Sequence, residues 1–484
     1  MTHFDPSKNK IYFGNTDRLA DWNTEITDQA KIIDKIKSML KNYLELDNVS
    51  FLFGSGTSIH LGAVAIRNFP VEVENYIKEK YELLDDTFDH FLTVVKKLQA
   101  DFLKYGKEHL IEGTQTFNDE RNWTFEIVDD IVRDNVKQEI AIEYEQVLNY
   151  LIAADFVFDK DRSITRADKY AELIIAIKEG LFNVCNLEKR EVSQSVIERK
   201  KASQFEKEKE QGNLLETKSK YIFHEKFVKA LLQRPLNLRR ANIFTANYDL
   251  AFEYAFDKLG VYYVDGFAGF HNRFFKPETF EYDIFYPGST TTGKVTRIEK
   301  VVRYFKLHGS LSWVNSEARD SNNIFGIEEK PLELIELLDK KGEIIIYPSA
   351  VKKSYTLDFP YSELFRQFAS TITQSQSVLI TIGYSFGDDH FNDIIYQALS
   401  NPTFTLIVVD FQGTENEYIN KLKELNDPRI IILEGAFFGD FLTFSDTLMP
   451  NFNNVDNNEK VANTLNELFS SKTSVLENNK NTEE

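Results

Sequence analysis

Six polar side chains of types that can bind or activate a substrate each follow a short apolar run. They are Ser55, Asn247, Asp249, His308, Ser385 and Asp410. A histidine can exchange a proton near neutral pH, and hydroxyl, amide and carboxylate groups can hold a polar ligand. Apolar runs that alternate with helical patterns indicate a parallel sheet, and ligands bind such sheets across the carboxyl ends of the strands. We therefore expect these six side chains to line one ligand-binding edge.

A glycine-rich turn follows the first strongly apolar run, in the stretch VSFLFGSGTS from Val49 to Ser58. Glycines let a ligand approach the backbone closely, and a helix beginning within residues 59–68 would direct free N–H groups at an anion such as a phosphate. The candidate contacts are Gly54, Ser55, Gly56, Thr57 and Ser58. An ordinary tight connection has the same pattern, so this stretch alone does not establish a phosphate site.

Several candidates also have a purely structural interpretation. His308 can be a structural histidine at a strand end, with its ring nitrogens hydrogen-bonded within the fold. Asn247 can cap the helix that follows it. Asp410 suits an acceptor for ribose hydroxyls, or a turn residue after its strand. Asp388, Asp389 and His390 suggest a metal, but adjacent residues seldom all face one ion. We therefore expect capping of the next helix there, and no metal.

Composition limits the function classes. The chain has 484 residues, enough for two or three domains, and 57 basic against 76 acidic residues give a net charge of −19. This charge argues against nucleic-acid binding by the whole chain. A single cysteine, Cys185, excludes a disulfide framework and a cysteine-rich zinc module, which fits a reducing cytoplasm. No signal peptide and no apolar run of about 18 residues is evident, so we expect no membrane span and a cytoplasmic location.

The pattern along the chain predicts an α/β fold, with a doubly wound, mostly parallel Rossmann-like sheet and a large inserted α-helical domain. Residues 1–67 and 239–449 would form the sheet domain, residues 68–238 the insertion, and residues 450–484 an acidic, mostly flexible tail. The predicted strands are 49–53, 242–245, 301–307, 343–347, 377–382, 405–409 and 430–433. The Phe- and Tyr-rich stretch Phe267 to Gly293 is predicted to be an elaborated loop beside the site.

Four motifs in this order resemble the sirtuin-like superfamily, and most closely its bacterial anti-phage NAD-degrading branch. They are GSGTS at 54–58, TANYD at 245–249, KLHGS at 306–310 and GYSFGDDH at 383–390. The resemblance implies that Asn247 and Asp249 lie at the nicotinamide and ribose end of NAD+ and that His308 is catalytic. In the hypothesis that follows, Ser385 and Asp410 take the adenosine half, and Gly383 is a further cofactor contact. Arg67 falls at the spacing of a family arginine, although Val-Ala-Ile replaces the Pro-Asp-Phe before it.

Two departures from the classical protein deacylases stand out. One cysteine cannot build their four-cysteine zinc module, and the gap between Asn247 and His308 is much longer than theirs. Both departures favour NAD+ cleavage by water, with NAD+ as substrate and no zinc. The alternatives are an NAD-dependent protein deacylase and a non-catalytic NAD- or ADP-ribose-binding scaffold.

The resemblance to anti-phage effectors further implies restraint, because uncontrolled NAD+ loss would kill the host. We expect a homo-oligomer, with a hexameric helicase-family ATPase or a phage protein as partner or trigger. The aromatic residues of the insertion and of the loop Phe267 to Tyr286 are candidate contacts. They can equally fill the core of their own domain.

Overall fold

The computed structural model describes most of the sheet domain and part of the predicted insertion. It covers residues 4–5, 7–25, 29–64, 69–81, 167–192, 219–286, 297–316, 323–345, 359–413 and 416–450, with residues 89, 91, 94, 150 and 151. Arg67, most of the predicted helices between residues 88 and 166, and the predicted tail beyond Pro450 lie outside these residues.

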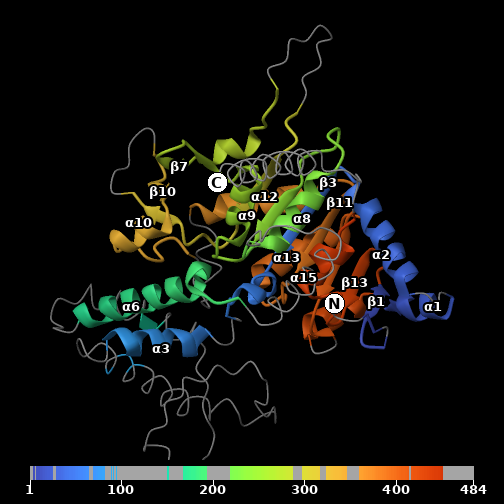
Figure 1. The fold of residues 1–484 in the computed structure, drawn as a ribbon, viewed down its shortest axis with the longest axis horizontal. Helices are drawn as coiled ribbons and strands as arrows, with labels where there is room; N and C mark the ends of the chain where they lie inside the picture. The colour runs from blue at the N-terminus through green and yellow to red at the C-terminus, as the bar shows by residue number, and fades with distance from the viewer. Residues whose placement is uncertain are drawn as a thin grey trace, which may run out of the picture.

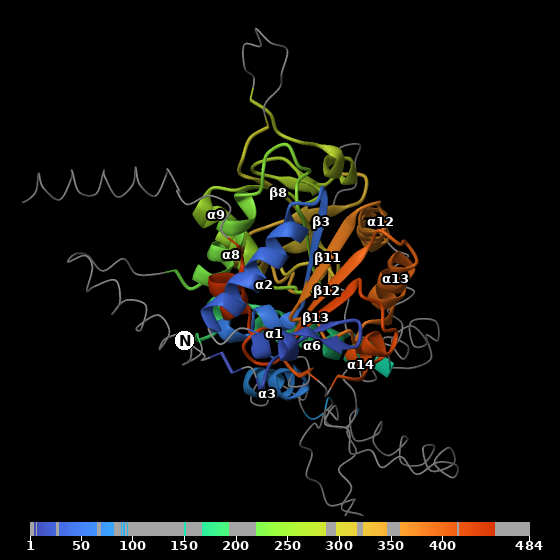
Figure 2. The same cartoon turned by 90° about the vertical axis from the view of Figure 1, so that its right-hand side faces the viewer.

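The core of the molecule is a nine-stranded, largely parallel sheet with the order β2-β1-β13-β12-β11-β3-β4-β8-β5 (Figures 1 and 2). Its strands are β1 (Lys10–Phe13), β2 (Thr16–Asp17), β3 (Asn48–Phe53), β4 (Asn242–Thr245), β5 (Tyr262–Val264), β8 (Val301–Lys306), β11 (Ser377–Ile382), β12 (Thr405–Asp410) and β13 (Ile430–Glu434). The seven strands from β13 to β5 are parallel. Strands β1 and β2 are antiparallel additions that the sequence pattern did not predict.

Alternation along the central strands places apolar side chains on both faces of the sheet. In β3, Phe51 and Phe53 join one buried cluster and Leu52 joins the other. The first face is covered by α2 (Gln29–Leu44), α8 (Ile222–Leu232) and α9 (Ala251–Leu259), and the second by α12 (Tyr361–Ile372), α13 (Asp389–Leu399) and α14 (Glu417–Glu424). Figure 2 shows the two helical layers on either side of the strands. The predicted doubly wound α/β fold is confirmed.

The order of the strands locates the place where a ligand binds such a sheet. After β3 the chain adds β4 and then β8 on one side, and it later adds β11, β12 and β13 on the other. The direction of winding therefore reverses between β3 and β11. In doubly wound sheets the crevice for a nucleotide lies at this reversal, outside the carboxyl ends of the strands.

A second, four-stranded antiparallel sheet replaces part of the predicted loop. It contains β6 (Phe267–Ala268), β7 (Arg273–Phe275), β9 (Trp313–Asn315) and β10 (Ile327–Glu329) in the order β6-β7-β10-β9. Phe267, Phe275 and Trp313 pack together with ring centroids 5.1 to 6.2 Å apart. Strands of two or three residues carry too little alternation to be recognised in a sequence, which explains the miss.

The strand predicted at 343–347 is wrong over its described part. Among residues 343–345, only Ile345 makes a β-bridge, which joins it to Gly309 in antiparallel fashion. The Ser310 N–H donates to the Ile344 carbonyl at 3.3 Å. This segment therefore braces the loop that follows β8 and does not extend the parallel sheet.

Two helices in the described part of the predicted insertion form a pair. Helices α3 (Phe69–Tyr81) and α6 (Ala167–Cys185) lie side by side, with α10 (Leu332–Leu337) next to α6 (Figure 1). The Glu179 carboxylate on α6 binds Lys80 on α3 and also Lys341, the latter at 3.2 Å. Helix α8, which we predicted as the end of the insertion, packs instead against the sheet, where Phe227 lies 5.0 Å from Phe51 between ring centroids.

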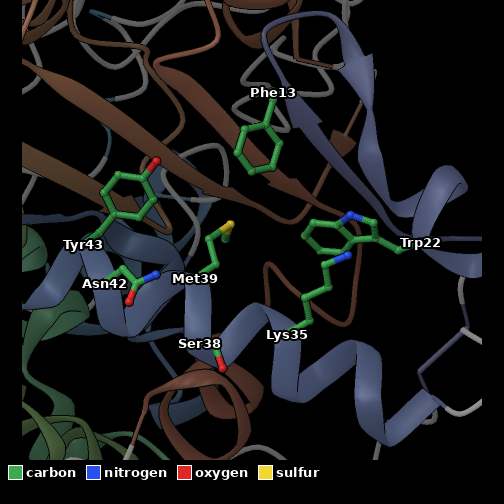
Figure 3. A pocket seen from close by; sticks show the side chains of 7 residues that line it. All are labelled: Phe13, Trp22, Lys35, Ser38, Met39, Asn42 and Tyr43. Carbon is green, nitrogen blue, oxygen red and sulfur yellow. The ribbon is translucent and has the colours of Figure 1, made fainter. Parts of the chain in front are cut away.

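A surface groove of about 390 Å³ lies at the opposite edge of the sheet from the polar strand ends. It is lined by Phe13, Trp22, Lys35, Ser38, Met39, Asn42 and Tyr43 (Figure 3). Phe13 pairs with Ile431 near the amino end of β13, so the groove is at the amino edge. The Lys35 ammonium lies 4.3 Å from the Trp22 ring centroid. Within the described ranges, no helix has the length and apolar character needed to cross a bilayer.

Candidate functional site

The polar residues predicted from the sequence form a row across five neighbouring strands at the carboxyl edge. In order they follow β12 (Asp410), β11 (Gly383 and Ser385), β3 (residues 54–58), β4 (Asn247 and Asp249) and β8 (His308). The reversal of winding lies inside this row. The structure thus brings the predicted side chains to one edge, as a ligand spanning a sheet requires.

The loop after β3 is held directly against the loop after β11. The Gly56 N–H donates to the Gly383 carbonyl at 3.1 Å, and the Gly54 N–H donates to the Ile382 carbonyl at 3.1 Å. A Cβ on Gly54 would lie only 2.4 Å from the Gly383 oxygen, and one on Gly56 would lie 2.7 Å from the Gly383 Cα. Close packing of two backbones therefore requires these glycines whether or not a phosphate binds there.

No α-helix begins directly after the glycine turn, so the helix predicted within 59–68 is wrong in its described part. Residues Ser55–Thr57 and Ile59–Leu61 form two short 3₁₀ turns instead. Gly62 then adopts a left-handed conformation with φ of 90°, and a Cβ there would lie 2.4 Å from the Glu191 carbonyl oxygen. Because residues 59–64 contain no α-helix, an anion at this loop would be held by groups of the loop itself.

Within the glycine loop, side chains divide into two groups. Thr57 and Ser58 are buried, and the Thr57 hydroxyl donates to the Gly54 carbonyl at 2.8 Å. Ser55 is only partly buried and Gly56 is exposed. Thr57 therefore shapes the loop, whereas Ser55 and the Gly56 backbone face outward, where a ligand can reach them.

The Asn247 amide joins β4 to the glycine loop. Its Nδ2 lies within donating distance of the Gly54 carbonyl at 3.1 Å, the Thr57 Oγ1 at 3.3 Å and the Ser58 Oγ at 3.4 Å. The Asn247 N–H donates to the Thr245 hydroxyl at 3.0 Å, which fixes the backbone. These contacts orient the amide plane at the reversal of winding. Asn247 does not cap α9: Leu250 holds the capping position, and the Asp249 carboxylate accepts from the Ala251 N–H at 3.0 Å.

Lys306 places a buried positive charge beneath the loops that follow β4 and β8. Its buried ammonium donates to Glu253 at 2.8 Å and to the Asp249 carbonyl, and Tyr304 donates to the same Glu253 carboxylate at 3.0 Å. Burial raises the pKa of Glu253 and the pKa of Asp249, and the Lys306 charge partly offsets both shifts. This residue of the KLHGS motif was not predicted as part of the site.

His308 lies at the end of β8, buried, with its ring facing α12 and α13. Its Nε2 lies 3.0 Å from the Nε2 of His390, which is in the first turn of α13. Phe391 packs against both rings, with centroids 4.9 Å from His308 and 4.6 Å from His390. The aromatic neighbours leave the two imidazoles little room to turn.

The segment Gly383 to His390 connects two distant strands. It leaves β11 and reaches His308 after β8, three strands away, a span of about 14 Å at the usual strand spacing. Asn392 anchors the segment, because its Nδ2 donates to the Phe386 carbonyl at 2.7 Å and its Oδ1 accepts from the Tyr384 hydroxyl at 3.2 Å. Phe386 itself has a positive φ of 59°, an uncommon conformation for a phenylalanine.

Asp388 takes the capping position of α13 but not the capping role that we predicted. Its carbonyl accepts from the Phe391 and Asn392 N–H groups at 3.1 Å each, whereas its side chain makes no capping hydrogen bond. One carboxylate oxygen of Asp388 and one nitrogen each of His308 and His390 all lie within 4.8 Å of one another. The neighbouring Asp389 is not part of this cluster.

The remaining predicted contacts lie further along the row. Ser385 is exposed on the segment after β11, and its carbonyl accepts from the Asn416 side chain at 3.0 Å. Asp410 is buried at the end of β12, where its carboxylate accepts from the Gly413 N–H at 2.5 Å. Burial raises the pKa of Asp410 to about 6. Asp410 thus performs the turn role, and a ribose contact there stays a prediction.

Sequence reasoning missed Lys306 and Asn392, and it considered His390 only as a metal or capping candidate. His390 and Lys306 each lie inside a motif that we had singled out, GYSFGDDH and KLHGS. The signal was available in both cases, since a histidine or lysine beside predicted site residues is a candidate by type. Their partners across the fold could not be read from the sequence.

Comparison with known families agrees with this geometry. A model of the SIR2-like domain matches residues 241–426, from β4 through α14. The match includes Asn247, His308 and the whole segment Gly383 to His390, and it begins after the glycine turn. No curated protein matches the chain. This match supports a sirtuin-like domain over residues 241–426 and, with it, NAD-related activity in general.

Proposed function

We propose that this chain, with its SIR2-like domain, is an NAD+ glycohydrolase that cuts the nicotinamide–ribose bond to give nicotinamide and ADP-ribose. The observation that carries the proposal is the row of polar groups across the β3–β11 reversal, with Asn247 and His308 at one end and Asp410 at the other. An extended dinucleotide suits such a row. The chemistry needs little more than a held ribose, a stabilised cation-like transition state and a positioned water.

In this proposal Asn247 orients the ribose hydroxyls or the water, because its amide is fixed by three oxygen atoms of the glycine loop. Ser55 and the outward Gly56 backbone hold the pyrophosphate, together with Gly54, Thr57 and Ser58 as the frame of the loop. Asp249 contacts the ribose at the nicotinamide end of NAD+. Gly383, Ser385 and Asp410 hold the adenosine half. Arg67 remains a proposed contact outside the described residues.

In this mechanism His308 accepts the proton from water, in the tautomer that donates its Nε2–H to His390. When the His308 Nε2–H donates to the His390 Nε2 across 3.0 Å, the His308 Nδ1 carries the lone pair that a base requires. As positive charge develops on the His308 ring, its Nε2 proton moves toward the His390 Nε2. A base of this kind contributes about 10²–10⁴-fold to a rate.

The test is to incubate the purified chain with NAD+, with and without an acyl-lysine peptide, and to separate the products by chromatography. Hydrolysis predicts nicotinamide and free ADP-ribose without peptide. An NAD-dependent deacylase would consume NAD+ only with the peptide and would yield an acylated ADP-ribose. A non-catalytic scaffold would bind NAD+ and convert none of it.

We further propose that the enzyme depletes NAD+ in bacterial antiviral defence, as a regulated homo-oligomer with a hexameric helicase-family ATPase or phage protein as partner. Exposed aromatic residues support a contact surface: Phe270 in the β6–β7 turn is 95% exposed and Tyr282 is 60% exposed. Other aromatics of this region, such as Phe275, are fully buried and fill its own core. Light scattering of the wild type against Phe270→Ser tests the surface, and an unchanged mass would count against its role.

A further inference from the structure

We infer that His308, Asp388 and His390 form a binding site for a divalent transition-metal ion, and that occupation of this site switches off the base. The inference concerns the regulation of the proposed NAD+ site, so its second half rests on the proposed function. The first half, metal binding, stands on the geometry of the three side chains alone.

The three side chains offer a suitable set of ligands. Two imidazole nitrogens and a carboxylate oxygen, all within 4.8 Å of one another, match the three-ligand sets that leave a fourth metal position open. The two Nε2 atoms lie 3.0 Å apart. Nitrogens bound to one tetrahedral zinc ion at about 2.0–2.1 Å are about 3.4 Å apart, so the two rings need to move by only a few tenths of an ångström. The Asp388 oxygen, which lies within 4.8 Å of them, has to approach by at most about 1.4 Å to reach the same spacing.

The rings are already held in place for this role. Phe365 meets His390 edge to face, with ring centroids 5.0 Å apart, and Phe391 packs against His308 at 4.9 Å. Asp388 is the first residue before α13, and its backbone is fixed by the Phe391 and Asn392 N–H groups. A preorganised set of ligands loses little conformational freedom when the ion binds.

The Asp388 side chain supplies an independent observation. A residue at the capping position usually accepts a hydrogen bond from the first turn of its helix, but the Asp388 side chain makes no such bond. Its carboxylate lies with the two histidines instead. Our expectation of no metal assumed that the adjacent residues Asp388, Asp389 and His390 would have to share one ion. In the structure the third ligand is His308, which follows β8, and not Asp389.

The identity of the ion follows from the type of ligand. Imidazole nitrogen suits zinc, copper, nickel and iron, whereas magnesium and calcium prefer oxygen ligands. We therefore take Zn²⁺ as the probe and Mg²⁺ as the ion that should fail to compete. With zinc on both Nε2 atoms, the remaining proton of His308 sits on Nδ1. His308 then has no lone pair to accept a proton from water, and hydrolysis stops.

The experiment is a titration of the full chain with Zn²⁺ in the absence of NAD+, by calorimetry, with the absorption spectrum of bound Co²⁺ as a second readout. The variants are His390→Ala and Asp388→Asn, and the matched control is His271→Ala, an exposed histidine in the β6–β7 turn. We expect one bound ion per chain, at least tenfold weaker binding in both site variants, and unchanged binding in the control and in excess Mg²⁺.

Activity assays then test the switch. Zn²⁺ should inhibit NAD+ loss in the wild type and in His271→Ala, a chelator should restore it, and Asp388→Asn should need at least tenfold more Zn²⁺ for the same inhibition. If zinc binds as expected but NAD+ is never consumed, the metal site stands and the proposed function fails. If NAD+ is hydrolysed but no stoichiometric binding occurs, or if His390→Ala and His271→Ala bind zinc equally, the metal inference is overturned. Melting curves without Zn²⁺ show whether both variants are folded. Curves with Zn²⁺ show whether the ion binds, since an ion bound to the folded chain raises its melting temperature.

Discussion

The Nε2 atoms of His308 and His390 lie 3.0 Å apart, although one histidine follows β8 and the other follows β11, three strands away. The segment Gly383 to His390 makes this contact possible by running along the carboxyl edge of the sheet. The same segment begins at Gly383, which packs against the glycine loop. One short stretch of chain therefore contacts both the glycine loop in the middle of the row and His308 at one end of it.

Lys306→Met should strongly destabilise the protein. The substitution leaves the buried Glu253 carboxylate without its cation, and breaking a buried ion pair from one side costs about 3–5 kcal/mol. The free energy of unfolding, measured by urea denaturation, is the readout. The double variant Lys306→Met/Glu253→Gln should recover a large part of the loss, because no uncompensated charge remains. Equal stability of the single variant and the wild type would contradict this account of the network.

Gly54→Ala should separate the loops after β3 and β11. The added methyl group would lie 2.4 Å from the Gly383 oxygen and 2.7 Å from the Tyr384 Cα, closer than atoms can approach. Overpacking of this kind costs about 1–3 kcal/mol, and we expect weaker NAD+ binding as well. The matched control is Gly387→Ala, where the nearest neighbour of the new methyl is the Ser385 Oγ at 3.5 Å. Melting temperature and KM are the measurements, and identical values for the two variants would argue against the close contact.

Acidification should destabilise the protein partly through His224. Burial, with a smaller effect of His60, lowers the pKa of His224 well below its ordinary value, and neither ring nitrogen has a hydrogen-bond partner among the described residues. The unfolded chain binds this proton at about pH 6.5 and the folded chain does not. The contribution of His224 is therefore complete above that pH and is lost as the pH falls, by at most about 1.4 kcal/mol per pH unit.

The variant His224→Phe isolates this effect. Phe252 and Phe441 already pack against the His224 ring, at 4.9 and 4.7 Å between centroids, so a phenylalanine suits the surroundings. Unfolding free energies at about pH 7.5 and about pH 5.5 bracket the ordinary histidine pKa. The variant should lose less stability than the wild type between these two values. A loss as large as that of the wild type would show that His224 does not carry the effect.

The parallel sheet could be predicted from the sequence because its central strands are largely apolar runs of four to six residues that end at polar residues. Stretches such as SVLITI at 377–382 are buried on both faces, which produces continuous apolar runs, and polar residues mark their ends. The four residues of β1 and the short strands β6, β7, β9 and β10 gave no comparable signal. Their pairing depends on contacts between distant segments, such as Lys10 with Glu434.

The site could be predicted only as a set of strand ends. Asn247 and His308 were identified by type and position, but the partner of each is set by the three-dimensional path of the chain. The pairing of His308 with His390 spans 82 positions, and the bond from Asn247 to the Gly54 carbonyl spans 193. The expected helix after Ser58 failed for a local reason, since Gly62 turns the backbone into the left-handed region.

The most direct test of the central claim is the rate of NAD+ loss with three proteins: wild type, Asn247→Ala and His308→Ala, with His271→Ala as the folded control. Our account predicts nicotinamide and ADP-ribose from the wild type and the control, and a decrease of about 10²–10⁴-fold or more in both site variants. Circular dichroism should show that all four proteins are folded. Equal turnover of NAD+ by the wild type and both site variants would contradict the assignment of the reaction to this edge of the sheet.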